Sequence, residues 1–596
     1  MEGLIVYCLI YPALAAHPVS LWLDFDDVQL LGQAPRSLLR NLQEWPGCSR
    51  DQGELQSVRV HSIILIRQEI KAMKACAYIF SFLDLSATFD YLHCYSQIPA
   101  NRPTFSMNRD SQLASPQSHA NGRANSHFTG SSYTDTGIDM NRFQHLRQAD
   151  PEGALLLRRE MSRDMNSLNL SAPESYMTLA VREALGAPLP PSEGYPDRRY
   201  HSGRHIVNEI EELCWRRALE TFDLSAETWG VNVQAFSGSL ANLYTYTALL
   251  EPGDTLFHMD LSHGGHLSHG HQTSKRKVSE SAFKFNAVAY HVNLETGIID
   301  YDGLHELAQQ HKPKIITVGG SSYSRLIDYE TMRKIADDVG ALLHCDMAHF
   351  CGLVAGRAIP SPFPHCHVVT TTTYKSFCGP KGAIIFYRSW MKDKINSTVF
   401  PRYQAARDYS VVLAISVALR QSQSSVYREQ QRQVVEASRM LAASLIELGY
   451  TIVGGGTDTH MVIIDLRPRK IDAAVAEKAL ELINIICNQN SIPGDQGGNC
   501  SGLRLGTPPM VLRGMPLLAF NKAAVLIHQA LEITHKIQAE MVPCQQTSAC
   551  SRQSRRVRIL EQFVAIAQKH SMIEDLKSQV AFIVSAHPPP WHERSS

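Results

Sequence analysis

The sequence predicts an α/β protein with a large domain, in which helices cover a mainly parallel sheet, and a smaller α+β domain after it. Short apolar runs such as 314–318 and 383–387 alternate with helical patterns such as 330–339, which is typical of parallel strands joined by helices. A long helical pattern at 426–448 then leads to strand-like runs and a helix at 450–453, 461–466 and 471–483. Ligands of such folds bind at the carboxyl ends of the strands.

Composition narrows the class of partner. The 596 residues are 44% hydrophobic, which is ample for a large core, and 57 basic residues balance 57 acidic ones. A formal net charge of zero does not favour nucleic acid or an anionic membrane, and no apolar run is long enough to span a bilayer. The 13 cysteines form no zinc-finger pair, so we expect reduced thiols and a cytoplasmic protein, with mitochondria as the alternative.

The first part of the chain does not follow the strand and helix pattern. Residues 1–16 resemble a secretory apolar segment but carry Glu2 instead of a basic residue, so secretion is not expected. Residues 101–132 are rich in Ser, Asn, Gln and Thr, which is typical of a linker. We therefore expect a partly disordered extension, a large domain, a small domain and a C-terminal extension at 1–140, 141–425, 426–540 and 541–596.

Lys375 follows the strand-like run 368–373 and precedes the Gly379-Pro380 break. Valines and threonines favour a strand, so this lysine is predicted where a buried strand reaches the surface. A partly desolvated lysine loses its proton near neutral pH and can condense with an aldehyde. Taken alone, the pattern fits a solvated lysine at a sheet edge better.

Asp346 ends another apolar run, 341–346, and the chain then makes an excursion before the strand that precedes Lys375. In a pyridoxal phosphate site a carboxylate keeps the pyridine nitrogen protonated while a lysine carries the aldehyde. A strand, a connecting segment and a second strand allow the side chains of Asp346 and Lys375 to meet at one edge of the sheet. Further upstream, the small residues 237–239 precede a predicted helix at 240–250, which suits either a phosphate or an ordinary helix cap.

Five histidines crowd one glycine-rich segment, at positions 258, 263, 266, 269 and 271. Their spacing matches no familiar ligand set, and no cysteine or suitably spaced carboxylate completes one. We therefore expect no metal site here.

Five motifs, in this order along the chain, resemble segments of the serine hydroxymethyltransferase family between about residue 150 and residue 538; they lie at 237–242, 264–270, 346–349, 365–373 and 501–508. The resemblance implies a fold-type I pyridoxal phosphate enzyme, similar in fold to aspartate aminotransferase. It implies interconversion of serine and glycine with tetrahydrofolate as the one-carbon acceptor. A homodimer or homotetramer is also implied.

The resemblance further implies roles for particular residues. At the cofactor, Lys375 would carry the aldehyde, Asp346 would hold the ring nitrogen, and His266 would stack on the ring. The phosphate would be held by Ser237, Gly238 and Ser239. Ser321 would lie near the ring, and His349 would contact the ring oxygen or the substrate. On the substrate side, Arg504 would bind the substrate carboxylate, and Ser171 and Tyr200 would line the substrate pocket. Glu193 would be the acid–base group at the substrate hydroxyl and folate, and Asn490 would lie on the folate side.

The sequence also departs from the family's pattern. Pro191 and His201 stand where the family has tyrosines, and Tyr374 replaces the histidine before the lysine. The glycine-rich loop that family members lend to the neighbouring subunit's phosphate reads here as residues 400–408 and contains no glycine. Cβ atoms in this loop would obstruct the close approach of its backbone to a phosphate. A positive charge from Arg402 or Arg407 is one way in which the loop could still bind the phosphate.

Other departures concern substrate and folate. Only Ser171 remains of the family's Ala-Ser-Glu-Asn segment, and Gln489 replaces a lysine beside Asn490. Two alternatives to the transferase therefore stay open. One is a folate-independent aldolase acting on β-hydroxy amino acids such as threonine. The other is a non-catalytic relative that binds cofactor or a partner subunit.

Overall fold

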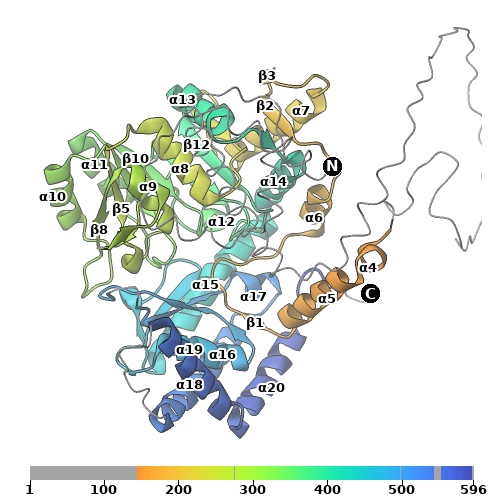
Figure 1. Cartoon of the computed structure of the whole chain (residues 1–596), viewed down its shortest axis with the longest axis vertical. Helices are drawn as coiled ribbons and strands as arrows, with labels where there is room; N and C mark the ends of the chain where they lie inside the picture. Colours follow the sequence, from red (N-terminus) through yellow and green to blue (C-terminus); the bar gives the residue numbers. More distant parts are fainter. Residues whose placement is uncertain (1–143, 274, 497–498, 542–551, 593–596) are drawn as a thin grey trace, which may run out of the picture. The chain divides into compact units, whose positions relative to one another are not determined.

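The computed structural model describes residues 144–273, 275–496, 499–541 and 552–592 (Figure 1). The secretory-like segment at 1–16, the linker at 101–132 and the extension at 1–140 lie outside the described residues. Cysteines of the described part are free thiols, and most of them are buried. Among the helices described, none combines the length and the apolar character needed to cross a membrane.

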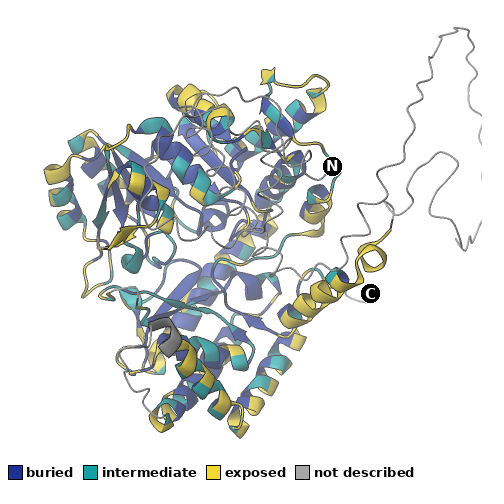
Figure 2. Cartoon of the chain, in the orientation of Figure 1, coloured by how far each residue is buried: buried dark blue, intermediate teal, exposed yellow. Residues whose placement is uncertain are grey.

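A seven-stranded sheet, with the order β4-β12-β11-β10-β9-β5-β8, forms the centre of the larger part. Its strands are β4 (Trp229–Asn232), β5 (Thr255–Met259), β8 (Asn286–Tyr290), β9 (Ile315–Gly319), β10 (Leu342–Asp346), β11 (Val368–Thr372) and β12 (Ala383–Arg388). All neighbours from β11 to β8 run parallel, and only β12 is antiparallel to its neighbours. The strands are largely buried, as their apolar sequences require (Figure 2). The predicted mainly parallel sheet is confirmed.

Helices with clear local start signals pack against this sheet. The side chains of Ser237, Asp300 and Asp328 accept hydrogen bonds from the first turns of α8 (Gly238–Leu249), α10 (Tyr301–His311) and α11 (Tyr329–Val339). The other helices of this part are α6 (Leu179–Leu185), α7 (His205–Thr221), α9 (Glu280–Lys284), α12 (Cys351–Ala355), α13 (Lys392–Ser397) and α14 (Tyr409–Ser422). The strand and helix alternation expected from the sequence is thus present.

Strand register aligns the carboxyl ends of three neighbouring strands. Asp346 at the end of β10 pairs with Gly319 of β9 on one side and Thr370 of β11 on the other. Gly319 has φ +90°, and a Cβ there would lie 2.1 Å from the carbonyl oxygen of Asp346. Glycine is therefore required where β9 leaves the sheet beside β10. This register brings the chain after all three strands to one edge.

Two small sheets flank the central one. The first has the order β13-β2-β3, with β2 (Ser192–Tyr195), β3 (Arg198–Arg199) and β13 (Ala406–Arg407), and lies beside α7 and α14 in Figure 1. The second is the hairpin of β6 (Gln272–Thr273) and β7 (Arg276–Lys277).

The smaller part begins with the long helix α15 (Ser425–Glu447). It contains an antiparallel sheet of order β14-β15-β18-β17, with β14 (Thr451–Ile452), β15 (Met461–Asp465), β17 (Asn488–Asn490) and β18 (Gly502–Gly506). Helices α16 (Ala473–Leu482), α17 (Pro508–Leu512) and α18 (Ala519–Glu540) accompany it. The long helix, the strands and the helix near 471–483 match the expected elements.

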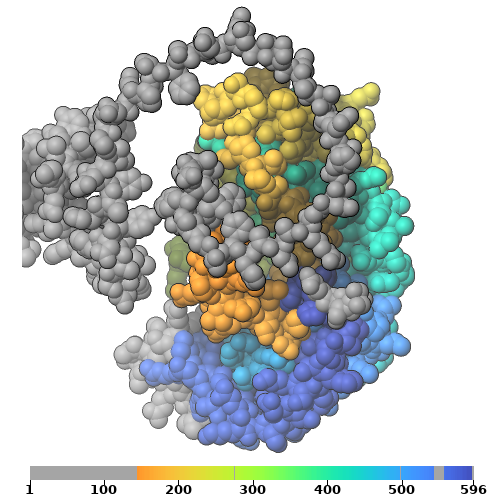
Figure 3. Space-filling model, turned by 90° about the vertical axis from the view of Figure 1, so that its right-hand side faces the viewer, coloured from red at the N-terminus to blue at the C-terminus, as the bar shows by residue number. Residues whose placement is uncertain are grey.

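The two ends of the described chain meet at this smaller part. The N-terminal elements are α4 (Leu146–Ala149), α5 (Pro151–Met165) and β1 (Leu168–Asn169), and β1 pairs with β16 (Ile485–Ile486). Helices α19 (Arg552–Ala567) and α20 (Ser571–Ser585) add side chains to the same core. Arg513, only 2% exposed, bonds the carbonyl oxygens of Ser167 at 2.9 Å and His587 at 2.5 Å. N-terminal and C-terminal segments therefore lie side by side, as Figure 3 shows.

Candidate active site

Lys375 lies in the turn directly after β11 and is only 8% exposed. The turn is held by two bonds of Thr373, whose hydroxyl donates to Pro380 O at 2.6 Å and whose carbonyl accepts from Gly379 N at 2.7 Å. Burial lowers the pKa of Lys375 to about 8, and the negative charge of Asp346 opposes that shift only in part. The side chain is thus partly unprotonated near neutral pH.

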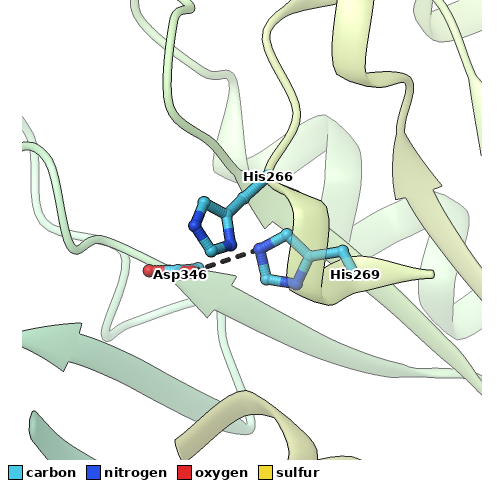
Figure 4. A group of neighbouring side chains, drawn as sticks. All are labelled: His266, His269 and Asp346. Carbon is cyan, nitrogen blue, oxygen red and sulfur yellow. Dashed lines mark ion pairs between the residues drawn. The ribbon is translucent and has the colours of Figure 1, made fainter. Parts of the chain in front are cut away.

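Asp346 is a buried carboxylate whose oxygens accept two hydrogen bonds and lie close to a histidine ring. Asn242 Nδ2 donates to Oδ2 at 2.8 Å, Ala348 N donates to Oδ1 at 3.0 Å, and His269 Nε2 lies 3.1 Å from Oδ2 (Figure 4). Burial by itself raises the pKa of Asp346, but pairing with His269 outweighs it and holds the pKa well below its usual range. The carboxylate is therefore ionised at neutral pH.

His266 lies over the same carboxylate, with its ring 5.6 Å from that of His269 and inclined to it by 65° (Figure 4). Its Nδ1 contacts Ser268 Oγ at 2.7 Å. Burial, and then the charge of His269, lower the pKa of His266 to about 4, so the ring is neutral at neutral pH. A neutral imidazole offers a face on which an aromatic ring can stack.

His266, His269 and Asp346 also form the one described cluster whose ligand atoms approach closely enough for a metal ion, within 4.8 Å of one another. Asp346 already accepts hydrogen bonds from Asn242 and from the Ala348 amide, and His266 already contacts Ser268. Both groups therefore have partners within the protein. We therefore interpret the cluster as a carboxylate held ionised by its neighbours.

The predicted phosphate end lies at the N-terminus of α8. Ser237 caps this helix by accepting a hydrogen bond from Leu240 N at 3.4 Å. A Cβ on Gly238 would lie 2.7 Å from Thr372 Cγ2, so the small residue lets the helix start lie against the end of β11. Ser239 is exposed. Free backbone N–H groups at such a helix start suit a phosphate.

Arg504, on β18, reaches the larger part of the molecule. Its Nη1 donates to Ser321 O at 2.7 Å and its Nε donates to Asn488 Oδ1 at 3.0 Å. Burial lowers the pKa of Arg504 to about 10, and no carboxylate of the described residues pairs with it. The contact joins Ser321, which follows β9, to the small domain. A buried cation without a carboxylate is suited to a substrate carboxylate.

Two further predicted residues lie beside the strand of Arg504. The segment of Ser171 runs along β18, because Gly506 N donates to Leu170 O at 2.7 Å. Asn490 ends β17, opposite Gly502 of β18. The structure thus gathers Ser171, Arg504 and Asn490 on neighbouring segments.

His349 follows β10 and packs against His460, a residue that the sequence did not single out. The ring centres are 5.8 Å apart and the planes differ by 18°. Burial, and then the charge of Lys375, hold the pKa of His349 well below its usual range, and burial lowers the pKa of His460 to about 3. His349 Nδ1 has no hydrogen-bond partner among the residues described. No motif around His460 could have marked it, since its contact depends on the docking of β15.

Glu193 and Tyr200 lie on the small sheet β13-β2-β3 and in the turn after it. Glu193 lies on β2, opposite Ala406 of β13. Tyr200 is 75% exposed, and its ring contacts that of His201. No hydrogen bond or ion pair in the described part of the chain joins either of them to Lys375 or Arg504.

Residues 146–527 match the family model described as serine hydroxymethyltransferase. The cytosolic serine hydroxymethyltransferase of Neurospora crassa is 46% identical over 414 residues, which cover 66% of this chain and 86% of that protein. The rabbit (Oryctolagus cuniculus) cytosolic protein is 45% identical, covering 67% and 86%. The mitochondrial protein of Schizosaccharomyces pombe is 42% identical, covering 73% and 91%.

Proposed function

This chain belongs to the serine hydroxymethyltransferase family, and we propose that it interconverts serine and glycine as a pyridoxal-phosphate-dependent glycine hydroxymethyltransferase with tetrahydrofolate as one-carbon acceptor. One observation carries the proposal. A lysine with a lowered pKa feels the charges both of an ionised buried aspartate and of an arginine that pairs with no carboxylate of the described residues. These are the groups that a pyridoxal phosphate enzyme acting on amino acids needs.

The residues present fit the cofactor. An ionised carboxylate suits a protonated pyridine nitrogen, a neutral imidazole suits a stacked ring, and the capped start of α8 suits a phosphate. Lys375, Asp346, His266, Ser321, His349 and residues 237–239 would hold it. When bound, pyridoxal phosphate supplies the electron sink that lets bonds at the amino-acid Cα break and form.

The protein's own groups each have a task in this scheme. Lys375 provides a partly unprotonated amine, because burial disfavours its ammonium form. Asp346 keeps a proton on a heterocyclic nitrogen placed against it, because the carboxylate itself does not take up that proton at neutral pH. Arg504 orients an amino-acid carboxylate, and the neutral His349, with its free Nδ1, can hydrogen-bond a ring oxygen or the substrate.

The acid–base and folate side is proposed to be completed by a second copy of the chain. Neither Glu193 nor the exposed Tyr200 forms a hydrogen bond or ion pair with Lys375 or Arg504 among the described residues, which supports a homodimer or homotetramer in which they act on the neighbouring subunit's substrate. Glu193 would then exchange a proton with the substrate hydroxyl, while Asn490 lies on the folate side. We place the protein in the cytoplasm, which the cytosolic relatives support.

The proposal is tested with purified protein, pyridoxal phosphate, L-serine and tetrahydrofolate. We expect a visible absorbance band from lysine-bound cofactor and glycine formation that depends on folate. Lys375→Ala is the matched control and should lose both. Acetaldehyde release from L-threonine, with no folate-dependent glycine formation, would point to the aldolase instead. Cofactor binding without turnover of either amino acid would identify a non-catalytic relative.

A further inference from the structure

We propose that Arg407 supplies the positive charge at the phosphate end of the cofactor site of its own chain, in place of the missing glycine-rich loop. The inference rests on the proposed function, since it names a binding residue for the phosphate of that cofactor. It assigns the role to one of the two arginines in the segment 400–408. The other, Arg402, is exposed and packs over the ring of Tyr403.

Arg407 is a buried cation whose Nε and Nη2 donors have no acceptor among the described residues. The residue is 3% exposed, and neither Nε nor Nη2 has a hydrogen-bond partner among the residues described. No carboxylate of the described part forms an ion pair with it. Burying a charge without a partner is strongly unfavourable, so such a group indicates an anion that binds from outside the chain.

The neighbouring acid does not provide that partner. Glu211 is fully buried and already accepts hydrogen bonds from Arg199, from Tyr409 Oη at 2.6 Å and from Gln234 Nε2 at 2.8 Å. Asp408, next in sequence, is exposed and caps α14 through Ser410 N. In this cluster Arg199 and Glu211 cancel each other, and Arg407 remains as the surplus charge.

The position of the guanidinium points to the phosphate end. Its central carbon lies 5.1 Å from the centre of the Phe236 ring, and Phe236 directly precedes Ser237, the cap of α8. On the other side, a Cβ built on Gly382 would lie 3.1 Å from Arg407 Nη2 and 3.3 Å from Thr373 Oγ1. Thr373 belongs to the turn that carries Lys375. Arg407 therefore lies between the two segments that frame the predicted phosphate site.

A phosphate monoester is the ligand that this arrangement suits. Guanidinium groups bind phosphate through two parallel N–H donors, and Nε with Nη2 is such a pair. The start of α8 offers further N–H groups to the same anion. Free phosphate has the same chemistry, so the experiment has to separate the two sources.

The experiment compares Arg407→Met, Arg407→Lys and the surface control Arg402→Met in the full-length apoprotein. Affinity for pyridoxal phosphate and for pyridoxal, which lacks the phosphate, is measured by fluorescence titration. We expect Arg407→Met to weaken pyridoxal phosphate at least tenfold while pyridoxal binding stays within twofold. Arg407→Lys should recover part of the loss, and Arg402→Met should match the unaltered protein. An unchanged ratio of the two affinities in Arg407→Met would overturn the inference.

Thermal unfolding provides a second readout that does not depend on activity. Inorganic phosphate should raise the Tm of the unaltered apoprotein but not that of Arg407→Met. The cofactor-loaded protein should give no further rise, because its phosphate already occupies the site. A rise in the loaded protein would mean that Arg407 serves a separate phosphate site, and the inference would fail. Without ligand, Arg407→Met should be at least as stable as the unaltered protein, since it removes an unpaired charge.

Mixed oligomers of Arg407→Met and Lys375→Ala chains decide whose site Arg407 serves. If it serves its own chain, no site in the mixture combines Lys375 with Arg407, and tight lysine-bound cofactor stays absent. Recovery of tight binding at half the sites would assign Arg407 to the neighbour and contradict the inference. If the unaltered protein binds no pyridoxal phosphate at all, the proposed function fails. If it binds pyridoxal phosphate and the Arg407 variants bind it as tightly as the Arg402→Met control does, the proposed function stands and this inference fails.

Discussion

Two regions of this protein bury charge, and they treat it differently. Around Asp346 the carboxylate is held by Asn242, His269 and a backbone amide, so several groups of the chain contact its oxygens. Around Glu211 the acid is satisfied by Arg199, Tyr409 and Gln234, yet Arg407 beside it is left over. The carboxylate of Asp346 is thus fixed in place by the chain itself, whereas the guanidinium of Arg407 leaves donors free for an anion.

Lys375→Ala should have the largest effect of the substitutions considered, because it removes the amine beside Asp346. We expect activity to fall by roughly a thousandfold or more, because the lost amine is the nucleophile in the proposed function. The loss of lysine-bound absorbance should accompany it. Glycine formation from serine is the measurement, with Lys381→Ala, the exposed lysine that follows the same turn, as the control. Equal loss in both variants would show that the turn, not the amine, was affected.

Glu211→Gln should destabilise the second region, because it removes the carboxylate beside Arg199 and Arg407. Two buried guanidiniums would then share no carboxylate, and we expect the free energy of unfolding to fall by about 3–5 kcal/mol. Burial raises the pKa of Glu211, and the hydrogen bonds from Tyr409, Gln234 and Arg199, together with the charge of Arg199, oppose that shift only in part.

Denaturant unfolding measures this effect. Glu429→Gln is the control, since Glu429 pairs with Arg432 at the solvent-exposed surface of α15, where an ion pair contributes little to stability. If the two variants lose the same stability, the cluster around Glu211 is not charge-balanced as described.

Asp346→Asn keeps the shape of the side chain and removes its charge. We expect about a hundredfold loss of activity, because a charge aimed at the reacting system in a buried site contributes about that much. His269 would also lose its ion-pair partner. Steady-state rates measure the effect, with Asp328→Asn at the cap of α11 as the control. Full activity in Asp346→Asn would remove this carboxylate from the mechanism.

Arg504→Lys should act mainly on substrate binding. A lysine cannot reproduce the bonds of Arg504 to Ser321 and Asn488 while also pairing with a carboxylate. We expect the KM for serine to rise about tenfold, with a smaller change in kcat. Arg467→Lys, at the exposed end of the same sheet, is the control. A pure kcat effect would argue against carboxylate binding by Arg504.

The pH dependence of cofactor attachment should be the smallest of these effects. The amine of Lys375 is reactive only when unprotonated, and its pKa is lowered to about 8. The attachment rate to apoprotein should therefore rise with pH through about 8 and level off above it, by about tenfold between pH 7 and 9. Stopped-flow absorbance follows this directly. A midpoint near the ordinary lysine value would show that burial does not tune this residue.

Local patterns in the sequence determined much of the fold. The apolar run before Asp346 became β10, the valine and threonine run before Lys375 became β11, and the helical period at 330–339 became α11. The family and its cofactor were also readable, because the motifs that bind one cofactor must keep particular side chains in order along the chain. Strand propensity, helix caps and glycine at turns act over a few residues, so they leave a trace in the sequence.

Tertiary structure alone decided how the charges are paired. Asn242 meets Asp346, His460 stacks on His349, and Arg407 turns toward Phe236. Glu193 pairs across β2 with Ala406, and Tyr200 is exposed, so their expected place at the substrate stays a prediction. Such contacts join residues far apart in sequence and depend on how sheets and helices dock. Burial then sets the pKa of each group, which no single stretch of sequence encodes.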